Sequence, residues 1–134
     1  MKKLFLLPLF LLALSATIFA QQDSNDGQTA QASIVGKWAG EFPGPDGKPI
    51  VFTMTITQDT YTFDYGSDGA IDSNGAYTAY GDQVTVWDIA GKDICPSDQK
   101  GIYKFTIDGD TATFTNVKDD CPCWGDAPLV VKRL

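Results

Sequence analysis

The stretch IVFTMTITQDTYTFDY, residues Ile50–Tyr65, decides the fold class. Large apolar residues alternate with threonine or aspartate in both of its halves. Because successive side chains of a β-strand point to opposite faces, this period of two predicts two strands that each have one apolar face. The apolar set is Phe52, Met54, Ile56, Tyr61, Phe63 and Tyr65. Between the halves, Gln58-Asp59 predicts a tight turn and therefore an antiparallel pair.

Segments of the same kind continue on both sides of this hairpin. Threonine, valine, isoleucine and aromatic residues are dense from residue 34 onward, and no helical periodicity persists through a window of about 12 residues. The predicted strands are Ile34–Phe42, Ile50–Gln58, Tyr61–Tyr65, Gly75–Tyr80, Gln83–Ile89, Gly101–Ile107, Thr111–Lys118 and Pro128–Leu134. Their connections alternate between long and short, so an up-and-down order gathers four long loops at one end. We predict an all-β, eight-stranded antiparallel up-and-down barrel, with a two-sheet sandwich as the alternative.

The charged residues exclude several classes of function. The chain has 134 residues, a net charge of −7 and no histidine, and Glu41 is its single glutamate. The acidic balance argues against nucleic acid and anionic membranes as partners. Without histidine there is no Ser-His-Asp triad, and the chain has neither a Gly-x-Ser-x-Gly motif nor a phosphate loop. We therefore expect no enzyme, no catalytic residue, no metal and no cofactor; carboxylates, tyrosine and lysine are the remaining acid–base groups.

The first twenty residues have the pattern of a secretory signal peptide. Lys2 and Lys3 precede the apolar run Leu4–Leu14, and the sequence becomes polar after Ala20. The apolar run is too short to span a membrane, so we expect cleavage and no stable membrane insertion afterwards. Residues 21–33 contain no large apolar side chain and are predicted to be a flexible linker. The barrel domain is then 34–134, and the protein is expected to be secreted or periplasmic.

A short motif at the start of the domain resembles one from a known family. The sequence Gly36-Lys37-Trp38 lies on the first predicted strand, and the only arginine, Arg133, lies on the last. Together with eight meandering strands and a signal peptide, this resembles the lipocalins of the calycin superfamily, most of all small secreted bacterial barrels. The resemblance implies that Gly36, Trp38 and Arg133 are structural, with the tryptophan packed against the arginine at the base. It also implies binding of a small apolar ligand.

The three cysteines lie in two of the long loops. Cys95 is in Ala90–Lys100, and Cys121 and Cys123 are in the loop before the last strand. Both loops belong to the same end of the predicted barrel, and an exported protein meets an oxidising compartment. We predict one structural disulfide from Cys95 to that second loop. Cys121 is the favoured partner and Cys123 the alternative.

The acidic residues near the long loops have two interpretations. Asp64, Asp68 and Asp72 are spaced by four, which would provide oxygen ligands for calcium or, more simply, solvated turn residues. Asp88, near the end of a strand, would be costly in a dry interior, so it is predicted to lie at the water-accessible rim.

Four aromatic residues lie beside or within the long loops and are the candidate ligand-binding residues: Phe42, Tyr65, Trp87 and Trp124. The other strand aromatics are expected to fill the core. We expect a monomeric exported protein that holds a small apolar or amphipathic molecule in or at the mouth of the barrel. The alternative is a filled barrel that displays its loops to a protein or a glycan. A cavity larger than a few water molecules would favour the first hypothesis.

Overall fold

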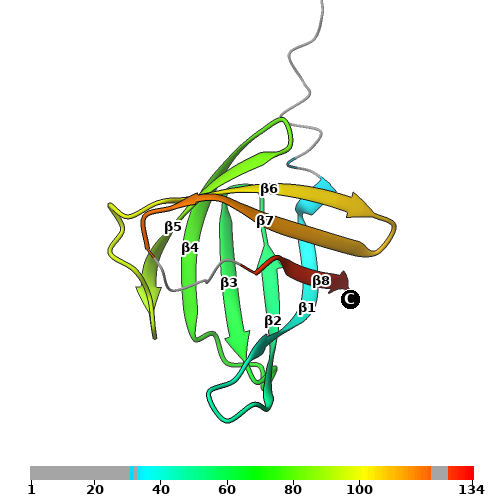
Figure 1. Ribbon diagram of the computed structural model, residues 1–134, viewed down its shortest axis with the longest axis vertical. Coiled ribbons are helices and arrows are strands. Elements are labelled where there is room, and N and C mark those ends of the chain that lie inside the picture. The colour runs from blue at the N-terminus through cyan, green and yellow to red at the C-terminus, as the bar shows by residue number, and fades with distance from the viewer. Residues whose placement is uncertain (1–30, 32, 122–126) are drawn as a thin grey trace, which may run out of the picture.

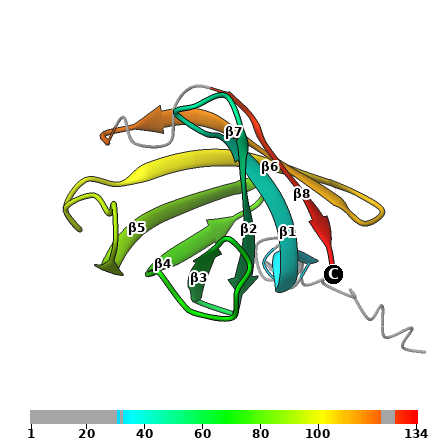
Figure 2. The same ribbon diagram turned by 90° about the horizontal axis from the view of Figure 1, so that it is seen from below.

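The protein is a closed barrel of eight antiparallel strands that follow one another in chain order (Figures 1 and 2). This computed structural model describes residues 31, 33–121 and 127–134. The strands are β1 (Gly36–Pro43), β2 (Pro49–Ile56), β3 (Thr60–Tyr65), β4 (Ser73–Tyr80), β5 (Gln83–Gly91), β6 (Gly101–Asp108), β7 (Thr111–Asp119) and β8 (Leu129–Arg133). The predicted fold class is confirmed, and the sandwich alternative is wrong. The predicted signal peptide and nearly all of the predicted linker lie outside the described residues.

The alternating pattern of β2 and β3 produces the burial that the sequence predicts. Phe52, Met54 and Ile56 are buried on β2, and the threonines between them are more exposed. The two strands pair antiparallel with Met54 opposite Phe63, so their apolar residues share the inner face of the sheet. Alternation therefore sets both the pairing face and the register of this hairpin.

The two ends of the barrel differ, as the alternating loop lengths predict. The connections β1–β2, β3–β4, β5–β6 and β7–β8 lie at one end, which we call the mouth. The short turns lie at the other end, which we call the base; in Figure 1 the β1–β2 loop is at the bottom and the β4–β5 turn at the top. Gly81 and Gly109 have φ angles of 58° and 59° in these short turns, which glycine adopts without strain.

Three of the strand pairings leave the mouth half of a strand unpaired. β1 pairs with β8 only at Trp38↔Arg133 and Ala39↔Lys132. β5 pairs with β6 only from Gln83 to Val86, although β5 continues to Gly91. β7 pairs with β8 only from Thr111 to Phe114, although β7 continues to Asp119. In all three cases the paired part of the first strand is its base-proximal half. The barrel wall is therefore less tightly joined at the mouth, beside β1, β5 and β7.

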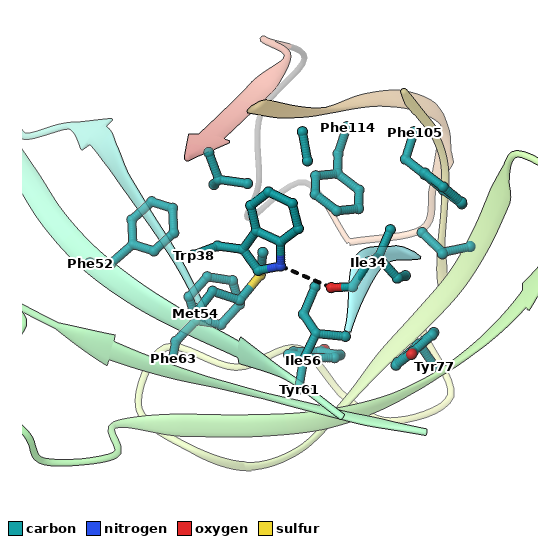
Figure 3. Close-up of a cluster of buried hydrophobic side chains, with 13 residues drawn as sticks. Ile34, Trp38, Phe52, Met54, Ile56, Tyr61, Phe63, Tyr77, Phe105 and Phe114 are labelled. Atoms are coloured by element: carbon teal, nitrogen blue, oxygen red, sulfur yellow. Dashed lines mark hydrogen bonds between the residues drawn. The ribbon is translucent and has the colours of Figure 1, made fainter. Parts of the chain in front are cut away.

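The base is closed by a plug made from the residues before and within β1. Trp38 is fully buried, and its indole Nε1 donates a 2.8 Å hydrogen bond to the carbonyl oxygen of Ile34 (Figure 3). The guanidinium carbon of Arg133 lies 4.1 Å from the centroid of the Trp38 ring. Arg133 also donates hydrogen bonds to the carbonyl oxygens of Val35 and Ser33. The only arginine thus covers the indole and ties the start of the domain to the last strand.

The first predicted strand began at Ile34, and this boundary is wrong. Ser33 and Ile34 are helical, and β1 begins at Gly36. The helical turn directs Ile34 into the core, where it is 1% exposed. Gly36 makes the change of direction possible, because its φ of 144° is a conformation that side chains disfavour. The other strand ends agree with the prediction to within two residues, which is the usual uncertainty of element boundaries.

Candidate functional site

A cavity of about 150 Å³ lies inside the barrel, and Ile34 of the base plug is part of its lining. Its described lining is almost entirely apolar and aromatic. The lining residues are Ile34, Glu41, Phe42, Pro43, Met54, Ile56, Tyr61, Phe63, Tyr77, Val84, Val86, Tyr103, Phe114, Ala127, Pro128 and Leu129. An apolar cavity of about this size is large enough to hold a benzene-sized molecule. The inward-facing side chains therefore leave part of the barrel interior empty.

The cavity reaches the surface along the β1–β8 seam. Its lining includes the end of β1 from Glu41 to Pro43, which lies beyond the two residue pairs that join β1 to β8. On the other side of the same gap it includes Ala127 and Pro128, which are exposed. The short pairing of β1 with β8 thus leaves room for an entrance on the mouth side of the barrel.

The structure brings two of the four predicted ligand-binding residues together. Phe42 lines the cavity and stacks on Phe52, with ring centroids 4.4 Å apart. Tyr65 stacks on Phe63 at 5.7 Å and lies 6.4 Å from the Phe42 ring, but it is not part of the cavity lining. These rings form one continuous aromatic group between β1, β2 and β3.

The other two predicted residues are placed differently. Trp87 lies on β5 between Val86 and Asp88, which both face inward, so its ring faces outward. There the Lys100 ammonium lies 4.7 Å from its ring centroid. Trp124 lies outside the described residues. Trp87 was predicted to bind ligand because it lies near a long loop, but that position does not determine on which face of β5 its ring lies.

Two tyrosines of the cavity wall are hydrogen-bonded to carboxylates behind them. Tyr61 donates a 2.7 Å hydrogen bond to Asp88 Oδ1, and Asp88 Oδ2 accepts one of 2.9 Å from the Cys95 amide. On β6 and β7, Tyr103 donates to Asp119 Oδ2, while Asp119 Oδ1 accepts from the Cys121 amide at 2.9 Å. Each carboxylate therefore joins a cavity tyrosine to one half of a cysteine pair.

Asp88 corrects an expectation from the sequence. It was predicted to lie at the solvated rim, but only 5% of it is exposed. The tyrosine hydroxyl and the backbone amide replace the water that a carboxylate would otherwise need. These partners come from positions 27 residues before and 7 residues after Asp88, so only the folded barrel assembles them.

The cysteines form the predicted disulfide. Cys95 in the β5–β6 loop is bonded to Cys121, two residues after the end of β7, with a Cα–Cα distance of 6.1 Å. The bond crosses the mouth end of β6 and closes the region where β5 has separated from β6. It therefore fixes the backbone amides that bind the two carboxylates. A disulfide-bonded barrel of this kind fits an extracellular or periplasmic location.

Burial raises the pKa of three tyrosines near the cavity. For Tyr61, burial and then the hydrogen bond to Asp88 raise the pKa far above its usual value. Burial also raises the pKa of Tyr65. For Tyr77, burial and the nearby Asp59 raise the pKa to about 12, and its hydroxyl donates to the Thr57 carbonyl oxygen at 2.6 Å. These phenols therefore keep their protons at neutral pH, and the hydroxyls of Tyr61 and Tyr77 donate hydrogen bonds to protein oxygens.

The acidic β3–β4 loop uses its carboxylates to hold its own backbone. Asp64 accepts hydrogen bonds from the amides of Asp68 and Gly69. Asp72 accepts from the Tyr65 amide and from Lys92 Nζ at 3.0 Å; the lysine hydrogen bond, then the amide, lower the pKa of Asp72. Within residues 33–121 and 127–134, no three acidic or cysteine side chains are grouped to hold a metal ion.

Charge is distributed unevenly along the barrel axis. We divide the described residues into the mouth half, which comprises the long connections and adjoining strand halves, and the base half. The mouth half has ten carboxylates and four lysines, an excess of six negative charges; the base half has four carboxylates and four cations. The mouth carboxylates are Glu41, Asp46, Asp64, Asp68, Asp72, Asp88, Asp93, Asp98, Asp119 and Asp120, and the lysines are Lys48, Lys92, Lys100 and Lys118. The base residues are Asp59, Asp82, Asp108, Asp110, Lys37, Lys104, Lys132 and Arg133.

Comparison of the chain with models of known protein families, with curated proteins and with solved structures finds no match. Among the described residues, no helix has the length and apolar character needed to cross a membrane. The eight-stranded antiparallel closed barrel is consistent with a lipocalin-like fold. The functional argument therefore depends on the geometry of the cavity.

Proposed function

We propose that the protein is a lipocalin-like binding protein that holds a small apolar or amphipathic molecule inside its barrel. The observation that carries this proposal is the apolar cavity of about 150 Å³. Ligand cavities are typically lined by apolar and aromatic side chains with a few polar groups, and this lining has that composition. Cavities in protein cores are otherwise few and small, because interiors pack closely.

The cavity also favours one of the two functions that the sequence left open. A barrel that only displays its loops to a protein or a glycan gains stability from a filled interior. An unfilled volume of about 150 Å³ is instead many times the volume that one water molecule requires. A carrier needs an empty volume of this kind to hold its ligand, whereas a protein that only displays its loops does not.

Two features support export of this carrier. The first is the signal-like sequence of residues 1–20, with Lys2, Lys3 and the apolar run after them. The second is the Cys95–Cys121 disulfide, since such bonds persist in oxidising compartments. The protein would therefore meet its ligand outside the cytoplasm, in the periplasm or after secretion.

Titration with N-phenyl-1-naphthylamine, a neutral apolar probe whose fluorescence increases in apolar surroundings, tests the proposal. Its phenyl ring has the size of benzene and would enter the cavity, while its naphthyl ring would extend through the entrance beside Phe42. We expect saturable, one-to-one binding with energy transfer from the tryptophans. Val86→Phe should abolish this binding, because Val86 lines the cavity and the larger ring fills it. Thr85→Phe adds a phenyl ring to the opposite face of β5 and should leave binding unchanged. Absence of saturable binding, or equal effects of the two variants, would overturn the proposal.

A further inference from the structure

The polar groups that face the cavity accept hydrogen bonds rather than donate them. Among the described lining residues, the only polar side chains are Glu41 and three tyrosines, with no lysine, arginine, serine, threonine, asparagine or glutamine. Each of the three tyrosines donates its hydroxyl proton to an oxygen of the protein. A phenol whose proton is donated presents an acceptor oxygen to any further partner. A ligand would therefore have to supply the donor.

Negative charge lies directly behind this wall. Asp88 is buried behind Tyr61, and Asp119 is held behind Tyr103. In the described part of the chain, neither carboxylate forms a salt bridge with a lysine or arginine; the bridges there join Lys92 to Asp72 and Lys118 to Asp120. A cation placed near a buried carboxylate gains Coulomb energy, while an anion loses it.

The wider electrostatic environment has the same sign. The mouth half carries an excess of six negative charges among the described residues, and the base half is balanced. A charged opening concentrates ligands of the opposite sign and speeds their association. The long-range field and the groups at the cavity wall therefore favour the same kind of ligand.

From these observations we propose that the cavity selects a small apolar molecule that carries a protonated amine over one that carries a carboxylate. This inference rests on the proposed binding function. The apolar body fills the cavity, and the ammonium group faces the Tyr61–Asp88 wall. There it donates to acceptor oxygens and lies near the faces of aromatic rings, which attract cations. A carboxylate in the same position finds no side-chain donor and is repelled by Asp88.

Three ligands that share a phenyl ring on a two-carbon chain test the proposal at neutral pH: 2-phenylethylamine, 3-phenylpropionate and ethylbenzene. They are cationic, anionic and neutral, and each is measured by displacement of N-phenyl-1-naphthylamine from the unmodified protein. We expect the amine to bind at least about tenfold more tightly than the carboxylate, which corresponds to about 1.4 kcal/mol. Equal affinities, or tighter binding of the carboxylate, would overturn the inference.

Variants that remove one negative charge locate the source of the preference. Asp88→Asn and Asp119→Asn should each reduce the ratio of amine to carboxylate affinity by about threefold or more, without reducing the affinity for ethylbenzene. Asp82→Asn makes the same charge change at the exposed base end and should leave the ratio unchanged. If Asp82→Asn has an equal effect, the wall is not the source and the inference is wrong. Should a wall variant fail to fold, the comparison of the three ligands on the unmodified protein still decides.

Failure of the inference is distinguishable from failure of the proposed function. Binding of the neutral probe and ethylbenzene without any preference for the amine overturns only the amine selectivity. If neither neutral compound binds, the carrier function itself is wrong, and the inference that rests on it falls too.

Discussion

The guanidinium of Arg133 covers the indole of Trp38, and this contact joins the last strand of the barrel to the first. The guanidinium carbon is 4.1 Å from the ring centroid, and the same two residues are paired in the β1–β8 register. Because β1 and β8 pair at only one other position, the Trp38–Arg133 contact forms a large part of the closure. The residues that plug the base therefore also join the first strand to the last, and this junction closes the barrel.

Replacement of Trp38 should destabilise the fold strongly. Trp38→Ala removes a fully buried indole and its hydrogen bond to Ile34, and should lower the free energy of unfolding by about 3–5 kcal/mol. Chemical denaturation followed by circular dichroism measures this change. Trp87→Ala, the same substitution on the outward face of β5, should cost much less. A loss below about 1 kcal/mol for Trp38→Ala would show that the plug does not hold the base together.

Gly36 should not tolerate a side chain. A Cβ atom at this position would lie 2.7 Å from Arg133 Nη1, and the φ of 144° disfavours any other residue. Gly36→Ala should therefore destabilise the protein by more than the roughly 1–3 kcal/mol expected from backbone conformation alone. Gly81→Ala provides the control, since Gly81 also has a positive φ but has open space where its Cβ would be. Equal losses in the two variants would show that Arg133 moves aside without cost.

The disulfide should contribute to stability through the loop it closes. Cys95 and Cys121 are 26 residues apart, and in the chain-entropy model a bridge of this span stabilises by about 3 kcal/mol. The double variant Cys95→Ser/Cys121→Ser should lose approximately that amount in chemical denaturation. Cys123→Ser removes the third thiol and should leave the bridge intact. Peptide mapping without reduction must recover Cys95 linked to Cys121; a link from Cys95 to Cys123 would contradict the structure.

Much of the architecture was predictable because the pattern that determines it is local. The alternation through Phe52, Met54 and Ile56 sets the inner face of β2, and loop lengths alone assign the mouth and the base. The position of Ile34 was not predictable in this way, because an isoleucine next to an apolar strand fits a strand as well as a helical turn. The burial of Asp88 depends on partners from other parts of the chain.

The candidate site was predicted less well than the fold. Phe42 was predicted to contact ligand and does line the cavity, while Trp87 lies on the outer face. The cavity tyrosines Tyr61 and Tyr103 were assigned to core filling, since alternation shows that a ring faces inward but not what its hydroxyl binds. Whether a barrel is full or hollow depends on the summed volumes of inward-facing side chains from eight strands. The alternation of residues along one strand shows which side chains face inward, but not whether together they fill the interior.

Stability should fall at alkaline pH because of the buried tyrosines. Their pKa values are raised in the folded state, so above about pH 10 the unfolded chain loses protons that the folded protein keeps. The contribution of these tyrosines to the free energy of unfolding is therefore fully present below pH 10. It declines as the pH rises toward about 12, the pKa of Tyr77 in the folded protein.

Urea denaturation at pH 8, 10 and 11 measures this decline. Tyr77→Phe should reduce the slope of unfolding free energy against pH above pH 10, because one of the responsible groups is gone. Tyr80 is 88% exposed, so Tyr80→Phe is the matched control and should keep the slope of the unmodified protein. If the slope of unfolding free energy against pH is the same in Tyr77→Phe as in the unmodified protein, groups other than Tyr77 cause the loss of stability at alkaline pH.

Removal of the Phe42 ring should weaken ligand binding more than removal of the larger Trp87 ring. Phe42 lines the cavity beside the β1–β8 gap, so Phe42→Ala takes away contact area at the entrance and should lower the affinity for N-phenyl-1-naphthylamine by about tenfold or more. Trp87 contacts Lys100 on the outer face, so Trp87→Ala should leave the affinity within about twofold, although it removes one energy donor. Affinities are therefore taken from direct excitation of the probe. If Trp87→Ala weakens binding as much as Phe42→Ala does, the ligand binds at the outer surface of β5, and the cavity is not the site.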